Sequence, residues 1–162
     1  MMNYPIISLA DYPQLLDAVV AQQWQVWEYD DPAELREFFA QELVSSEVTT
    51  LPKTWLMMAD VTLTTIIGAV TLSLNEMGDS QPSERNPWLG YLYIDPTYRG
   101  QGLAKTLTAF AVSESAKLGF ASCYLYASDE MPRYLKWGWL PLQTLEFQDE
   151  RVTVMQNPPP NL

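Results

Sequence analysis

An apolar strand that leads into a glycine-rich turn and then a helix constrains the fold of this chain more than any other feature. Residues 88–94 form a short apolar run typical of a buried strand, and residues 102–117 carry the apolar spacing of a helix. Residues 121–127 form a second buried strand by the same criterion. Two strands joined through a helix need a crossover connection, so we expect them to be parallel within one sheet.

The rest of the chain supplies further elements for that sheet. Apolar residues at three- and four-residue steps predict helices at 11–29 and 32–44, and Asp31 before Pro32 is a favourable N-cap. Further strands are expected at 6–9, 54–58, 62–74, 140–147 and 151–156, with a loop at 75–87 and a short helix at 131–137. In this order, the elements predict an α+β fold: a central mixed, mostly antiparallel sheet with helices on both faces.

The length of 162 residues favours a single domain, which we place at residues 1–157. Residues 158–162 begin with three prolines and are expected to form a flexible tail. The first residues carry no basic-then-apolar signal sequence, and no apolar run is long enough to span a membrane. We therefore expect a cytoplasmic protein without a membrane partner.

The charge balance argues against several classes of partner. Nine basic and twenty acidic residues give a net charge of −11. Nucleic acids and anionic membranes are bound through clustered Lys and Arg, so neither is an expected partner. The acidic excess would attract a cationic substrate, although it would equally serve only to keep the protein soluble.

Two residue types limit the chemistry that the chain can perform. It contains no histidine, which removes every catalytic scheme based on an imidazole and all histidine-ligated zinc sites. The single cysteine, Cys123, lies in an apolar run and is expected to be an inert core thiol. No metal site is therefore expected.

The glycine turn, Arg99-Gly100-Gln101-Gly102-Leu103-Ala104, has the chemistry of an anion site. Glycine lets the backbone approach a ligand closely, and the first amides of a helix have no acceptor within the helix. Together with the helix dipole they suit a phosphate or pyrophosphate, and Arg99 and Lys105 flank them. The turn matches neither a dinucleotide fingerprint nor a Walker loop. The alternative is a tight strand-to-helix turn that needs glycine only for its shape.

Three segments together resemble the GNAT N-acetyltransferase superfamily. Residues 91–104, an apolar strand followed by a proline-containing turn and Arg-Gly-Gln-Gly, are similar to the acyl-CoA motif of that superfamily. The segment Tyr134-Leu135-Lys136-Trp137-Gly138-Trp139 resembles its Y-x-K-x-G-F/W segment, and residues 66–70 resemble the strand one hairpin upstream. The order and spacing of the three hold from about residue 55 to residue 139, roughly half of the chain.

The resemblance implies acyl-CoA, most simply acetyl-CoA, as a co-substrate. Its pantetheine would lie against the backbone of Leu92, Tyr93 and Ile94. Its pyrophosphate would be held by the amides of Arg99, Gly100, Gln101, Gly102, Leu103 and Ala104. Tyr134 falls where the family often carries a tyrosine that protonates the leaving CoA thiolate, a role that a hydroxyl protonated at neutral pH can fill. The alternative for Tyr134 is a packing role.

Two departures from the family pattern concern the acceptor side. Ser128-Asp129-Glu130 stands where many members carry an asparagine, and Ser128 is the candidate to replace that cofactor contact. The strand at 88–94 holds no carboxylate, so a general base must act from elsewhere through water. The candidates in the preceding loop are Glu76, which we take first, Asp79 and Glu84.

The resemblance places the acceptor site between the first two helices. Glu28, Asp30 and Asp31 lie there and are the candidate ligands for the substrate. Each of these carboxylates, like those of the loop, could equally be a solvated surface group.

These observations predict direct transfer of an acetyl or other short acyl group from acyl-CoA to a primary amine of a small cationic substrate. No covalent acyl-enzyme is expected, because no histidine can activate a nucleophile. The alternative is a non-catalytic acyl-CoA-binding or regulatory module on the same fold. The sequence leaves a homodimer open.

Overall fold

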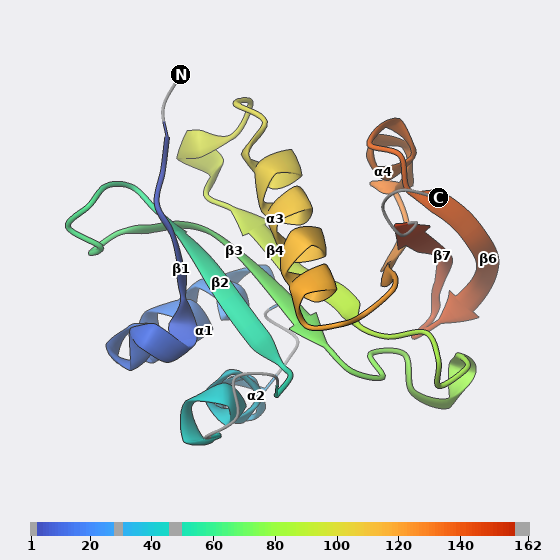
Figure 1. Ribbon diagram of the computed structural model, residues 1–162, viewed down its shortest axis with the longest axis horizontal. Coiled ribbons are helices and arrows are strands. Elements are labelled where there is room, and N and C mark those ends of the chain that lie inside the picture. The colour runs from blue at the N-terminus through green and yellow to red at the C-terminus, as the bar shows by residue number, and fades with distance from the viewer. Residues whose placement is uncertain (1–2, 28–30, 46–49, 158–162) are drawn as a thin grey trace.

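The computed structural model describes residues 3–27, 31–45 and 50–157. Seven strands form one sheet in the order β1-β2-β3-β4-β5-β7-β6 (Figure 1). The strands are β1 Ile6–Ser8, β2 Lys53–Met58, β3 Ile66–Ser73, β4 Trp88–Ile94, β5 Cys123–Ala127, β6 Leu140–Phe147 and β7 Glu150–Asn157. The α-helices are α1 Leu16–Val26, α2 Pro32–Val44, α3 Leu103–Lys117 and α4 Met131–Lys136.

Strand pairing follows the predicted pattern. The β4–β5 pair is parallel and every other pair is antiparallel. The helix α3 makes the crossover between β4 and β5, because a parallel pair cannot be joined by a tight turn. The predicted α+β fold with a mixed, mostly antiparallel sheet is confirmed.

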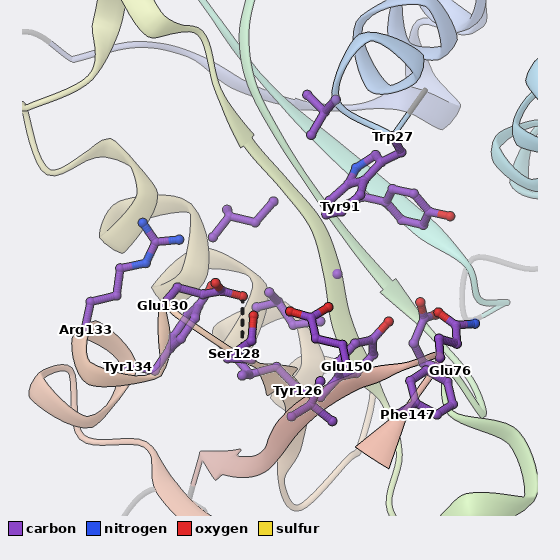
Figure 2. A pocket seen from close by; sticks show the side chains of 18 residues that line it. Trp27, Glu76, Tyr91, Tyr126, Ser128, Glu130, Arg133, Tyr134, Phe147 and Glu150 are labelled. Carbon is purple, nitrogen blue, oxygen red and sulfur yellow. Dashed lines mark hydrogen bonds between the residues drawn. The ribbon is translucent and has the colours of Figure 1, made fainter. Parts of the chain in front are cut away.

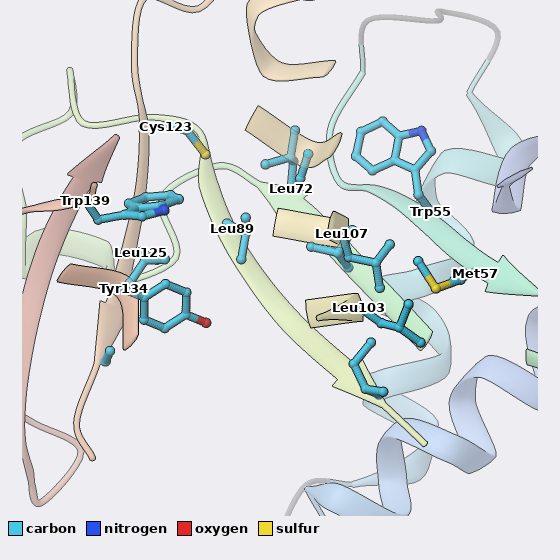
Figure 3. Close-up of a cluster of buried hydrophobic side chains, with 14 of the residues drawn as sticks. Trp55, Met57, Leu72, Leu89, Leu103, Leu107, Cys123, Leu125, Tyr134 and Trp139 are labelled. Atoms are coloured by element: carbon cyan, nitrogen blue, oxygen red, sulfur yellow. The ribbon is translucent and has the colours of Figure 1, made fainter. Parts of the chain in front are cut away.

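Helices cover both faces of the sheet (Figure 1). The side chains of β2 alternate between the two buried layers that result. Trp55 and Met57 pack with α3 in one buried cluster, which Figure 3 shows in close-up. Leu56 and Met58 pack with α1 and α2 in another. Because successive side chains of a strand point to opposite faces, a continuous apolar run fits a strand buried on both sides.

The helix expected at residues 11–29 begins later than predicted. Two 3-10 turns, Leu9–Asp11 and Pro13–Leu15, precede α1, which starts only at Leu16. The Ser8 hydroxyl caps the first of these turns by accepting a hydrogen bond from the Ala10 N–H over 3.3 Å. Tyr12 has φ −135° and ψ 62°, because a residue before proline avoids the helical conformation, so the helix does not extend back through it.

The strand expected at residues 62–74 is also shorter, because residues 60–65 turn. The Asp60 carboxylate accepts hydrogen bonds from the backbone N–H and the hydroxyl of Thr62. Leu63 adopts a left-handed conformation with φ 56°, which lies outside the regular strand region. The β-branched composition of this segment therefore misled the prediction, since threonine also serves turns through its hydroxyl.

Cys123 is buried, and that burial raises the pKa of its thiol to about 12, as expected for a core thiol. Within residues 3–27, 31–45 and 50–157, no helix is both long and apolar enough to cross a membrane. Over the same ranges, no group of three or more Cys, Asp or Glu side chains could hold a metal ion.

One buried carboxyl, Glu42, ties α2 to the start of β2. Its Oε1 accepts the N–H of Thr54 over 3.0 Å, while its Oε2 is buried and makes no hydrogen bond within the described structure. Burial, the largest effect, raises the pKa of the Glu42 carboxyl from 4.5 to about 7. The folded protein therefore binds the Glu42 proton more tightly than the unfolded chain does.

We expect this carboxyl to make stability depend on pH. The Glu42 contribution is fully present below pH 4.5 and is lost as pH rises to about 7, where the folded protein also releases the proton. The loss should be roughly 3 kcal/mol of unfolding free energy at 1.36 kcal/mol per pKa unit. Urea unfolding across this pH range should show a shallower decline for Glu42→Gln than for wild type. The exposed Glu37→Gln on the same helix is the control, and equal slopes in all three proteins would contradict the expectation.

Candidate active site

The candidate site is a cavity of about 930 Å³ between β4 and β5. These strands pair at one position only, Trp88 with Tyr124, and the Tyr124 N–H donates to the Pro87 carbonyl over 2.9 Å. Beyond that pair the strands diverge, and the cavity occupies the space between them (Figure 2). From β4 it is lined by Leu89, Gly90, Tyr91 and Leu92, and from β5 and the following turn by Leu125, Tyr126, Ala127 and Ser128.

A bulge in β4 accompanies this divergence. The β3–β4 register shifts between Ala69 and Thr71, and Tyr91 on the opposite strand has φ 49°. A non-glycine residue rarely adopts this conformation, and packing must hold it there. The Tyr91 ring lies against two phenylalanines of α2, with centroid distances of 5.3 Å to Phe38 and 5.1 Å to Phe39. The aromatic cluster under the sheet thus fixes the bulge.

At the predicted anion site, both glycines of the turn adopt left-handed conformations. Gly102 is the N-cap of α3 with φ 78°, and Gly100 has φ 83°. In the described part of the chain, the backbone N–H groups of residues 100–105 donate to no protein acceptor. A Cβ on either glycine would meet no atom within 4 Å, so the space in front of the turn is open. The turn can therefore present several amides to one anion.

Two side chains of this segment are engaged with the backbone. Arg99 Nε donates to the Ile94 carbonyl over 3.0 Å, and Gln101 Nε2 donates to the Tyr98 carbonyl over 3.2 Å. The Asp95 carboxylate accepts the Thr97 N–H over 2.9 Å and caps the 3-10 turn Pro96–Tyr98. These contacts hold the turn rigidly at the end of β4.

Tyr134 lines the cavity from α4. It is buried, and its ring packs edge-to-face on Trp137 at 5.4 Å and Trp139 at 6.0 Å. Burial raises the pKa of its hydroxyl above the usual range, while the Arg133 guanidinium, 5.4 Å from the ring centroid, acts in the opposite direction. The net increase keeps the hydroxyl protonated at neutral pH, as a proton donor requires.

Among the described residues, three carboxylates line the cavity: Glu76, Glu130 and Glu150. The Ser73 hydroxyl donates to Glu76 Oε2 over 2.8 Å, and the other oxygen of Glu76 would lie 4.0 Å from a Cβ on Gly90. Glu76 and Glu150 lie on one side of the cavity, whereas Glu130 lies with Tyr134 on the other (Figure 2). Of the three loop carboxylates considered from the sequence, Glu76 lines the cavity, while Asp79 and Glu84 are exposed and do not.

Of the expected acceptor carboxylates, Asp31 falls within the described residues, and it does not line this cavity. Asp31 is exposed, and its side chain caps α2 by accepting the Ala33 N–H over 2.9 Å. Glu28 and Asp30 lie outside the described residues. The neighbouring Trp27, at the end of α1, does line the cavity.

Several residues of the cavity wall were missed by the sequence analysis. They are Trp27, Tyr126, Glu130, Arg133, Phe147, Gln148, Glu150 and Val152. The β6–β7 hairpin contributes the last four, and its turn residues Gln148 and Asp149 have φ 51° and 62°. The sequence signal was Gln-Asp between two strand patterns, which indicates a tight hairpin turn but not what the hairpin faces.

The sequence matches the profile of the Acetyltransferase (GNAT) family over residues 16–138. This chain belongs to the GNAT acetyltransferase family. The match includes β4, the glycine turn, α3 and Tyr134, which are the parts of the site that the sequence identified. It ends before β6, so the part of the cavity wall formed by the β6–β7 hairpin lies outside the match. A search of curated protein sequences found no match.

Solved structures share the GNAT fold along nearly the whole chain. A chimera of spermidine N-acetyltransferase SpeG from Vibrio cholerae and hSSAT has a TM-score of 0.69 at 18% identity, covering 95% of this chain and 96% of its own. The NatC complex bound to Gag peptide and CoA has a TM-score of 0.67 at 16% identity, covering 97% of this chain and 99% of its own. Arabidopsis thaliana NAA60 with a bisubstrate analogue has a TM-score of 0.66 at 14% identity, covering 96% of this chain and 97% of its own. At these identities the likeness establishes the fold.

We expect Gly102→Val to abolish binding of acetyl-CoA. A β-branched side chain is strained at φ 78° and would stand in front of the amides that face the anion. The measurement is the rise in melting temperature on adding acetyl-CoA, which reports binding to the folded state.

The matched control is Gly119→Val, at the other end of α3. Gly119 has φ 96° and open space around its Cα, so this variant suffers similar backbone strain away from the turn. It should lose stability yet keep the full shift with acetyl-CoA. An undiminished shift in Gly102→Val would show that the turn serves only the shape of the backbone.

Proposed function

We propose that this protein transfers an acetyl group from acetyl-CoA directly to a primary amine of a small cationic substrate in the cytoplasm. The observation that carries the proposal is the diverging β4–β5 pair, which leaves one edge of β4 open along a cavity that also contains a carboxylate and a protonated tyrosine. Family membership supports acetyl transfer in general, and the following contacts support the finer assignment.

The open edge of β4 fits the acyl-CoA arm. On its other edge β4 pairs with β3, with Tyr93 opposite Ala69 and Ile94 opposite Gly68. An amide chain such as pantetheine can pair with the unoccupied edge as an added strand would. The amides of residues 100–105, beyond the end of β4, are the proposed donors to the pyrophosphate. The residues present therefore fit acyl-CoA.

Glu76 is the proposed general base. It is half-buried on the cavity wall, next to the only glycine of β4, Gly90, where a small residue leaves room for the amine. The hydrogen bond from the Ser73 hydroxyl orients its carboxylate. Glu76 would take the proton from the ammonium or the attacking amine, directly or through one water.

Tyr134 is the proposed general acid. Its hydroxyl is directed from the α4 side toward β4 (Figure 3). The sulfur of the leaving thiolate would receive the proton that the hydroxyl holds at neutral pH. Glu76 and Tyr134 thus divide the two proton transfers between opposite sides of the cavity (Figure 2).

The cationic nature of the acceptor is supported by the composition of the cavity wall. Glu76, Glu130 and Glu150 supply negative charge, and Tyr126 and Phe147, in edge-to-face contact at 5.4 Å, supply aromatic surface. Carboxylates and aromatic faces both attract ammonium groups. The net charge of −11 acts in the same direction at longer range. One protein with the same fold is named for acetylation of spermidine, which is a polyamine.

We expect acetyl-CoA turnover, followed as free thiol, with cationic amines such as polyamines or amino sugars and much less with neutral or anionic amines. The kcat/KM for the best amine should fall as salt rises, because attraction between exposed charges is screened within about 10 Å at 0.1 M salt. A preference for neutral amines, or no salt dependence, would contradict the cationic assignment.

A pair of variants tests whether the amine reacts in the cavity. Glu76→Gln should lower kcat/KM by roughly 100-fold or more, as expected for loss of a general base. Glu84→Gln changes the same charge on an exposed residue of the same loop, outside the cavity wall, and should leave turnover unchanged. Equal effects in the two variants would show that the loss of rate comes from the change in net charge and not from the loss of a base in the cavity.

Tyr134→Phe should lower kcat with little change in acetyl-CoA affinity, because the hydroxyl acts only as the thiolate leaves. The loss should be on the order of 100-fold, the lower end for general acids, since a thiolate is a good leaving group. Phenylalanine keeps the ring contacts with Trp137 and Trp139, so stability should be retained. Steady-state kinetics and acetyl-CoA titration measure the two effects.

Tyr124→Phe is the control for this substitution. Its hydroxyl accepts a hydrogen bond from Gln156 over 3.3 Å and does not line the cavity. This variant should keep wild-type turnover. If Tyr134→Phe also kept it, water would be the proton donor.

A further inference from the structure

Gln23 is a fully buried polar residue that the proposed chemistry does not use. It lies in the last turn of α1 with 1% of its surface exposed. Its Nε2 donates to the backbone carbonyl of Tyr91 over 3.2 Å, and its Oε1 accepts the indole N–H of Trp27 over 3.1 Å. Burying an amide is costly unless both of its ends are hydrogen-bonded, so these two contacts make its burial tolerable.

The carbonyl that Gln23 holds belongs to the bulge in β4. The peptide group between Tyr91 and Leu92 is planar and trans, so its C=O and N–H point in opposite directions. Fixing the Tyr91 carbonyl toward α1 therefore turns the Leu92 N–H away from α1.

The strand register gives the direction in which the Leu92 N–H points. The Asp95 N–H donates to the Ile67 carbonyl, and Tyr93 stands opposite Ala69 in the same register. Alternate residues of an antiparallel strand direct their N–H and C=O groups to opposite edges. Leu92 therefore directs its N–H to the edge facing β5, and Leu92 lines the cavity there.

We propose that Gln23 is a positioning residue: it holds the Tyr91–Leu92 peptide so that the Leu92 N–H donates to the thioester carbonyl oxygen and to the oxyanion formed from it. This inference rests on the acetyl transfer proposed above. Preorganised backbone donors of this kind stabilise developing negative charge because they need no reorganisation during the reaction. Gln23 itself touches no reacting atom.

The strain at Tyr91 gives this hydrogen bond its importance. A left-handed conformation is unfavourable for an L-residue, and rotation of the neighbouring peptides would relieve it. The bond from Gln23, together with the packing of the Tyr91 ring, opposes that rotation. The other end of Gln23 contacts Trp27, whose ring stands edge-to-face to Tyr91 at 6.3 Å and lines the cavity. Gln23 thus connects Trp27, in the cavity wall, with the peptide that carries the Leu92 N–H.

Gln22, the preceding residue, provides a matched control. Its Nε2 donates to the Ile66 carbonyl over 3.1 Å, which is the same kind of bond from the same helix to the same sheet. Ile66 lies on β3 and not on the cavity wall. Gln22→Met and Gln23→Met therefore each remove one side-chain bond to a strand carbonyl, but only Gln23→Met releases the bulge.

The experiment measures kinetics and the carbonyl stretch of bound acetyl-CoA labelled with ¹³C at the thioester carbonyl. In Gln23→Met we expect kcat to fall about 10-fold or more, less than full loss of an oxyanion donor, with the KM for acetyl-CoA little changed. The infrared stretch should rise toward the frequency in water-free solvent. Gln22→Met should match wild type in both measurements, whatever its loss of stability.

Equal kcat and equal stretch in Gln22→Met and Gln23→Met would overturn the inference. If wild type transfers acetyl to no amine, the proposed function fails, while the stretch of bound acetyl-CoA still tests the role of Gln23. If Gln23→Met does not fold, Gln23→Asn keeps an amide but shortens the side chain by one methylene, so that its N–H falls short of the Tyr91 carbonyl. A rise of the stretch in that variant supports the inference, and an unchanged stretch overturns it.

Discussion

The separation of β5 from β4 after a single residue pair is the constraint on which the site depends. A parallel pair that continued along β4 would occupy the edge that faces the cavity and leave no room for a ligand. The bulge at Tyr91 breaks the regular ladder on the other side of the same strand, and aromatic side chains of α2 keep it in place. The cavity therefore follows from an interruption of hydrogen bonding that the core beneath the sheet stabilises.

The unit formed by β4, the glycine turn, α3 and β5 could be predicted from the sequence because its signals are local. The apolar run before Gly100, the glycines of the turn and the helical spacing after them each act over a few residues, and one connection rule then makes β4 and β5 parallel. The start of α1 and the start of β3 were placed wrongly, since Pro13 and the Asp60 carboxylate impose turns that compete with the apolar pattern.

The cavity wall could be predicted only in part, because it is assembled from segments far apart in the chain. Glu76 was found among three loop carboxylates, but nothing in its sequence context distinguishes it from Asp79 or Glu84. Trp27 and Glu150 reach the cavity through the packing of α1 and through the pairing of β7 with β5, which no local pattern encodes. Gln23 has the sequence signature of an ordinary surface residue, yet it is buried.

The sheet order β5-β7-β6 places the last hairpin at an edge, where one of its strands has only a single neighbour. The side chains of β6 are largely exposed, so few core contacts restrict its sequence. The hairpin nevertheless contributes Phe147 and Glu150 to the cavity. Evolution, or an engineer, could therefore vary the cavity-facing residues of this hairpin to change the acceptor, while the buried residues of β7 and the strand and turn proposed to bind the acyl donor stay intact.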